Sequence, residues 1–127
     1  MLDRSNGSLY VTIQMSPFIL KECLDGDRSP YGDWFNGLDA VAAARVDRYV
    51  RRMEQGNFGY SSHVGGGVQE LHVDFGPGYR VYYGREGDSI VILLGGGSKR
   101  GQSRDIAEAI VLWERFKRRK METQAGR

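Results

Sequence analysis

The fold is decided by one stretch of the chain, Glu70-Leu71-His72-Val73-Asp74-Phe75-Gly76-Pro77-Gly78-Tyr79-Arg80-Val81-Tyr82-Tyr83. Apolar and polar residues alternate along both halves of it, which is the period of a β-strand with one buried face. Pro77 suits a turn because its φ is fixed, and the glycines on either side tolerate positive φ. The stretch therefore predicts an antiparallel hairpin of two strands, 68–75 and 79–83.

The polar face of this hairpin is the first candidate for a functional surface. We expect Phe75 to lie opposite Tyr79 across the turn, with both rings on the core side. In that register His72 lies opposite Tyr82 on the other side of the sheet. The polar face then holds Glu70, His72, Asp74, Arg80 and Tyr82.

A carboxylate, an imidazole, a guanidinium and a phenol on one open surface suit acid–base chemistry on a phosphodiester. Arg80 is the best candidate for binding a phosphate, because its planar fork matches two oxygens. The alternative is an ordinary solvated sheet face with cross-strand ion pairs, which antiparallel sheets commonly have. The residues alone leave both interpretations open.

The rest of the chain predicts further strands and helices around this hairpin. Ser29 can cap a short helix that begins with Pro30, and Asp39 can cap a second helix that runs to about Gln55. Strands are expected at 18–24 and 89–94, and a last helix from about Ser103. The order β-α-α-β-β-β-α predicts an α+β domain: a twisted, mostly antiparallel sheet of about four strands, with two N-terminal helices and a C-terminal helix packed on one face.

Two runs of glycine border the predicted strands. Gly65-Gly66-Gly67 is interpreted as a mobile entry to the hairpin. Gly95-Gly96-Gly97 is interpreted as a flexible exit from the last strand, which lets Lys99 and Arg100 reach the rim of the polar face. A phosphate-binding P-loop is not expected at Lys99, because the glycine and hydroxyl positions of that motif are not matched.

Composition indicates a folded globular chain of 127 residues, 40% hydrophobic and 27% charged. No apolar run approaches the roughly 20 residues that span a bilayer, and the polar N-terminus lacks the apolar core of a secretory signal. The single cysteine, Cys23, excludes an internal disulfide and a cysteine metal site. We expect one cytoplasmic domain over 1–127, with no metal and no cofactor.

Residues 1–14 allow two interpretations. Leu9, Val11 and Ile13 alternate with more polar residues, which would suit an extra edge strand. Alternatively, 1–14 is a disordered extension and Met15, rather than Met1, is the physiological start.

Positive charge is gathered in clusters, although the net charge is only +2. Such clusters attract anionic partners such as nucleic acid, and they also occur as solvated helix faces. One cluster consists of Arg45, Arg48, Arg51 and Arg52, and the other of Arg115, Lys117, Arg118, Arg119 and Lys120.

From Trp34 to about Trp113 the sequence resembles the RelE/ParE toxin superfamily, in the HigB-like subgroup described as addiction module killer proteins. The block Phe75-Gly76-Pro77-Gly78-Tyr79-Arg80-Val81-Tyr82-Tyr83 carries most of the resemblance. The other matching blocks are 53–57, 64–68 with Glu70-Leu71, 93–99 and 104–106. The histidine and tyrosine set at the C-terminus of some members has no counterpart here.

The resemblance implies a type II toxin that pairs with a small antitoxin, usually a helix-turn-helix DNA-binding protein. Many such toxins cleave mRNA on the ribosome and arrest translation, without a metal, by attack of the ribose 2′-OH. On this chain Arg80 would stabilise the phosphate, with Lys99 as a second cation. Glu70 or His72 would act as the base, and Tyr82 would orient the reacting groups or act as the acid. RNA-binding is expected from Arg45, Arg48, Arg52, Arg100 and Arg104.

A second function from another class fits the same superfamily. In it, the chain is a ParE-like toxin that binds and inhibits DNA gyrase and does no RNA chemistry. The polar face favours the ribosome-dependent endoribonuclease.

Overall fold

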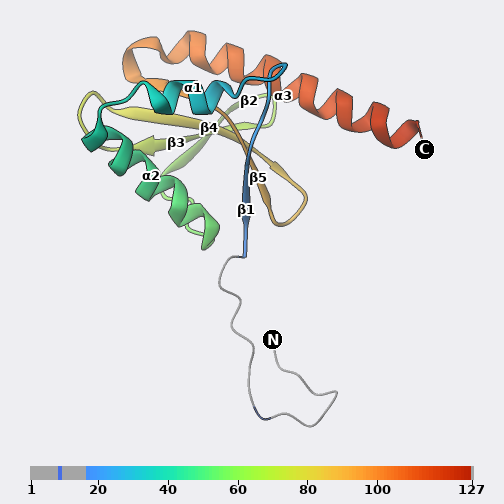
Figure 1. The fold of residues 1–127 in the computed structure, drawn as a ribbon, viewed down its shortest axis with the longest axis horizontal. Helices are drawn as coiled ribbons and strands as arrows, with labels where there is room; N and C mark the ends of the chain where they lie inside the picture. Colours follow the sequence, from blue (N-terminus) through green and yellow to red (C-terminus); the bar gives the residue numbers. More distant parts are fainter. Residues whose placement is uncertain (1–8, 10–16, 127) are drawn as a thin grey trace.

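The computed structural model describes Leu9 and residues 17–126 (Figure 1). The interpretations of 1–14 and of the start at Met15 therefore fall outside the described residues, apart from Leu9. The elements follow in the order β1 (Ile19–Glu22), α1 (Pro30–Asn36), α2 (Ala40–Glu54), β2 (Ser61–Gly65), β3 (Val68–Val73), β4 (Tyr79–Glu86), β5 (Ile90–Ser98), the 3-10 helix η1 (Lys99–Gly101) and α3 (Gln102–Ala125).

The strands form one mixed sheet in the order β1-β5-β4-β3-β2. β1 runs parallel to β5, and the other neighbours are antiparallel. The α+β class is confirmed, but the described residues form five strands where about four were expected. The additional strand is β2, which alternation does not reveal because it is short and begins with Ser61, Ser62 and His63.

Helices cover both faces of the sheet, so the expectation of helices on one face was wrong. α1 and α2 pack on one side, where Tyr31 and Val46 join Leu71 and Val81 in a core. α3 packs on the other side, where Leu112 and Trp113 join a second core with Tyr82, Ile92 and Leu94. The physical reason is that β4 and β5 carry large apolar or aromatic side chains on both faces, and both must be covered.

The predicted helix starts are confirmed. The Ser29 side chain accepts a hydrogen bond from the Gly32 amide at 2.9 Å, and Pro30 is the first residue of α1. The Asp39 side chain accepts one from the Ala42 amide at 2.9 Å and caps α2. α3 is the longest helix of residues 17–126, and neither it nor α1 or α2 has the apolar length that crossing a bilayer requires.

The glycines at 95–97 lie inside β5, so their interpretation as a flexible exit was wrong. Their small size serves packing. A Cβ on Gly96 would overlap the indole ring of Trp34, and a Cβ on Gly97 would overlap the carboxylate of Asp105. On β4, a Cβ on Gly84 would come within 2.7 Å of the Trp113 ring. Glycine thus lets α1 and α3 approach the sheet backbone from opposite sides.

We expect Gly96→Ala to destabilise the protein by about 1–3 kcal/mol, because the added methyl group forces the Trp34 ring out of its place. Gly95→Ala is the matched control, since a Cβ at Gly95 meets nothing within 4 Å. Urea unfolding of both variants measures the difference. Equal midpoints for the two variants would contradict this account of the glycine run.

Candidate functional site

The hairpin brings the predicted polar residues together in a register other than the expected one. Val73 rather than Phe75 lies opposite Tyr79, and His72 lies opposite Arg80. The expected register was wrong because β3 ends at Val73 and residues 74–78 form a wider turn, closed by a 3.0 Å hydrogen bond from the Gly78 amide to the Phe75 carbonyl. The shift is two residues, so every side chain keeps its expected face.

Glu70 is the centre of the group, and its side chain is only 2% exposed. His72 Nε2 lies 3.0 Å from Glu70 Oε1, and Arg80 Nε lies 3.6 Å from the same oxygen. Gln102, at the start of α3, donates from Nε2 to both carboxylate oxygens at 3.0 and 2.8 Å. A buried carboxylate is stable only with such partners, so Glu70 fixes the positions of the side chains around it.

His72 is the more accessible member of the group, with 20% of its side chain exposed. Its ring stacks on Tyr60 at a centroid distance of 4.3 Å, and Nε2 lies 3.5 Å from the Ser62 hydroxyl. Burial, helped by the positive charge of Arg80, lowers the pKa of His72, and Glu70 partly opposes this. The imidazole is therefore mainly neutral near pH 7 and can accept a proton.

Tyr82 lies on the expected face but is not open to solvent, because α3 covers it completely. Burial, together with the negative charge of Glu70, raises the pKa of the Tyr82 hydroxyl. That hydroxyl and Arg80 Nε are buried, and neither has a hydrogen-bond partner among the described residues. Tyr82 is therefore poorly placed to exchange a proton with a substrate.

The structure separates the remaining members of the predicted polar face. Asp74 is exposed beyond the end of β3 and is not part of the group around Glu70. Lys99 is exposed in η1 beside the hairpin turn, where its amide donates to the Gly78 carbonyl at 3.0 Å. Gln102 was missed by sequence analysis, because the pairing of α3 with this face is not visible in the periodicity of either element.

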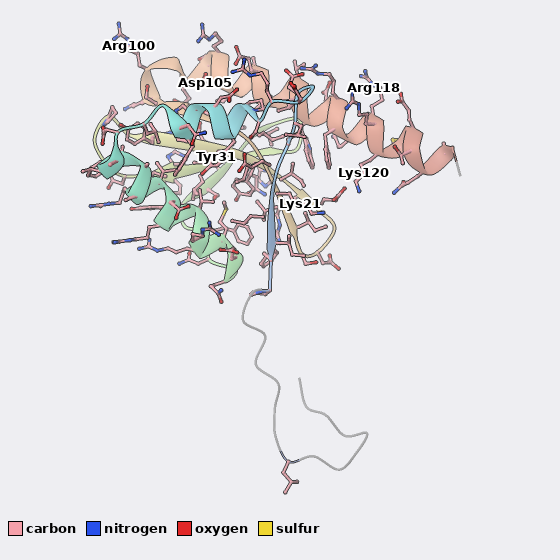
Figure 2. The ribbon with its side chains drawn as sticks, in the orientation of Figure 1. Lys21, Tyr31, Arg100, Asp105, Arg118 and Lys120 are labelled. Atoms are coloured by element: carbon pink, nitrogen blue, oxygen red, sulfur yellow. The ribbon has the colours of Figure 1, made fainter. Side chains whose placement is uncertain are left out.

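Two of the predicted RNA-binding cations, Arg45 and Arg100, lie near the hairpin turn. Arg45 of α2 stacks over the Phe75 ring at 4.6 Å, and Arg100 projects from η1, beside Lys99 (Figure 2). Others lie outside this group: Arg48 is exposed on α2, Arg52 stacks over Tyr49 at 5.0 Å, and Arg104 pairs with Glu108 at 3.7 Å.

A second cationic region lies on the C-terminal half of α3, which extends beyond the sheet (Figure 1). Arg118 and Lys120 project from it (Figure 2). Part of this charge is neutralised, because Arg115 pairs with Asp25 at 3.2 Å and Lys120 with Glu86 at 3.1 Å. At a rise of about 1.5 Å per residue, this region lies roughly 24 Å along the helix from Gln102.

Two hollows lie away from the group around Glu70. One, of about 610 Å³, lies between the end of β1 and the C-terminal half of α3, with Cys23 and Phe116 in its lining. The other, of about 500 Å³, lies between α1 and α3 and is lined by Trp34 and Ala109. The group around Glu70 therefore lies on the sheet face outside both hollows.

Comparison with known proteins gives a relative but no activity. No protein-family model matches the chain. An uncharacterized protein of Haemophilus influenzae is 39% identical over 83 residues, which make up 65% of this chain and 84% of the Haemophilus protein. The chain belongs to the same family as that protein.

We expect Gln102→Ala to lower the free energy of unfolding by about 1–3 kcal/mol, because Glu70 stays buried but loses two hydrogen bonds. Gln124→Ala, at an exposed position of the same helix, is the matched control and should change it by less than about 0.5 kcal/mol. Denaturant unfolding measures both. A Gln102→Ala variant as stable as the control would show that Gln102 does not stabilise the carboxylate.

The lowered pKa of His72 predicts a loss of stability in mild acid. The unfolded chain takes up this proton near pH 6.5, whereas the folded protein does so only at lower pH. Stability is therefore complete above about pH 6.5 and falls as the pH drops toward the folded pKa. Between about pH 7.5 and pH 5.5, the free energy of unfolding of His72→Gln, measured by denaturant unfolding, should fall less than that of the wild type.

Proposed function

We propose that this protein is the toxin of a type II toxin–antitoxin pair of the RelE/ParE superfamily, a ribosome-dependent endoribonuclease that cleaves mRNA. The observation that carries the proposal is the buried Glu70 carboxylate, which holds His72 and Arg80 side by side on a partly exposed part of the sheet face. An ordinary solvated sheet face does not need a buried carboxylate with partners on three sides.

The proposed reaction needs a base, an acid and a stabilised phosphate. A base removes the proton of the 2′-OH, and the 2′-oxygen attacks the adjacent phosphorus. The bond to the 5′-oxygen of the next nucleotide breaks, and that oxygen receives the proton that the base took up, relayed through a water molecule. The products are a 2′,3′-cyclic phosphate and a 5′-hydroxyl, and the step requires neither a metal nor a cofactor.

His72 is the better base of the two that the sequence offered, because the Glu70 oxygens are occupied by Gln102 and His72. Nε2–H of His72 donates a hydrogen bond to Glu70, which leaves Nδ1 as the basic nitrogen. Arg80 and Lys99 supply positive charge for the pentavalent phosphate. Tyr82 acts as a positioning residue, because it is fully buried against Glu70.

Cations around the hairpin turn support the same proposal. A single-stranded RNA that passes Arg80 would also pass Lys99 and Arg100 in η1, whereas Arg45 lies over Phe75 on the α2 side of the sheet. These contacts go to phosphates, so they position the chain without reading its sequence. The cognate antitoxin would block this surface in the cytoplasm until it is degraded.

Arg80→Ala should abolish growth arrest and reduce mRNA cleavage by about 100-fold or more, because the developing phosphate charge loses its principal cation. Arg80→Lys keeps the charge beside Glu70 but lacks the fork, so it should retain part of the activity. Arg118→Ala, on the far half of α3, is the matched control and should act like the wild type. Mapping of mRNA 5′ ends after induction, with and without the neighbouring gene, is the measurement.

If Arg80→Ala still arrests growth while mRNA stays uncut, the nuclease proposal fails. Growth arrest with accumulated DNA breaks would instead favour a ParE-like inhibitor of DNA gyrase. Near-ultraviolet circular dichroism of each purified variant establishes that a loss of activity is not a loss of fold.

A further inference from the structure

Tyr60 is an exposed aromatic residue placed directly beside the candidate site. Tyr60 directly precedes β2 and is 70% exposed. Its ring lies nearly parallel to the His72 ring, with 24° between the two planes. One face of the Tyr60 ring is thus taken by His72. The exposure of the residue leaves the other face of the ring accessible.

The loop before β2 holds Tyr60 in place from both sides. The Asn57 side chain accepts from the Gly59 amide at 3.0 Å, and the Ser61 hydroxyl donates to the Phe58 carbonyl at 2.7 Å. The Tyr60 carbonyl accepts from the His72 amide at 2.9 Å. The ring is therefore presented at low entropic cost to any planar group that stacks on it.

Phe58 anchors the same loop in the core. Its ring lies 5.1 Å from that of Phe18 and 6.0 Å from that of Tyr83. The loop thus directs the Phe58 ring into the core, whereas the Tyr60 ring points outward and lies against the imidazole of His72.

We propose that Tyr60 is a stacking platform for one unpaired nucleobase of the RNA, an inference that rests on the proposed function. Tyr60 and Arg80 flank the same imidazole, the first by ring stacking and the second as its cross-strand neighbour. A nucleotide whose base lies on Tyr60 directs its adjoining phosphate toward His72 and Arg80. Stacking on an aromatic side chain and phosphate contact to an arginine are the two components of single-strand recognition.

The proposal has a consequence for substrate class. Every base has a π-face, so the platform tolerates any base but requires that it be unpaired. The selection is therefore for single-stranded RNA over duplex, with little preference for sequence at this position. A protein partner could also stack an aromatic ring here, but the neighbouring cations favour a phosphate-bearing ligand.

The test compares Tyr60→Leu with Tyr60→Phe, which keeps the ring. The probe is a ribosome bound to an mRNA whose codon in the vacant A site carries 2′-O-methyl riboses. These riboses lack the attacking 2′-OH, so binding is measured without cleavage. Tyr60→Leu should weaken binding by roughly ten- to hundredfold, and Tyr60→Phe should stay within about twofold of the wild type. Circular dichroism establishes that both variants are folded.

An abasic codon separates stacking from any indirect effect on His72. When the bases of that codon are removed, wild type and Tyr60→Leu should bind with equal affinity. If Tyr60→Leu binds the intact codon as the wild type does, or if its loss persists on the abasic codon, the platform is overturned. Were Tyr60→Leu to weaken only binding of the antitoxin, a protein partner would occupy the ring instead.

The two proposals fail in different ways. If Arg80→Ala arrests growth without mRNA cleavage, the nuclease proposal fails, whatever the result for Tyr60. If Tyr60→Leu cleaves mRNA and binds the codon as the wild type does, only the stacking proposal fails.

Discussion

The structure depends on the burial of one carboxylate. Glu70 lies between the sheet and α3 with 2% of its side chain exposed, where an ion without partners would be very unfavourable. Its partners come from three elements: His72 on its own strand, Arg80 on β4 and Gln102 on α3. The same set of contacts therefore orients the candidate site and joins the C-terminal helix to the sheet. Stability and site geometry are for this reason difficult to change separately.

Sequence alternation predicted which face each hairpin residue occupies, and this held for Glu70, His72, Arg80 and Tyr82. It could not predict the register, because an even shift leaves the faces unchanged. It also could not predict that α3 covers Tyr82. A strand face open to solvent and a strand face covered by a helix can both carry polar residues at alternate positions. Sequence analysis did not predict β2 or the contact of Gln102 with Glu70 for a related reason: both depend on neighbours that are distant in the sequence.

The positions of the cations could likewise be predicted only in part from the sequence. Arg45 comes from α2 and the consecutive residues Lys99 and Arg100 come from η1, and only the fold brings these two segments to the same hairpin turn. The cluster on the C-terminal half of α3 is more conspicuous in the sequence, yet ion pairs to Asp25 and Glu86 neutralise part of it. The local density of charge in the sequence therefore does not indicate which cations lie near the buried carboxylate.

The parallel pairing of β1 with β5 also governs how the molecule is made. Ile19 lies opposite Ile90, so the first strand of the described chain cannot join the sheet until its late partner has been synthesised. Gln102 comes later still, and Glu70 remains without its two amide hydrogen bonds until α3 has left the ribosome. Such long-range contacts slow folding, because chain entropy is lost before they form. The candidate site can thus be assembled only after β5 and the start of α3 have been synthesised.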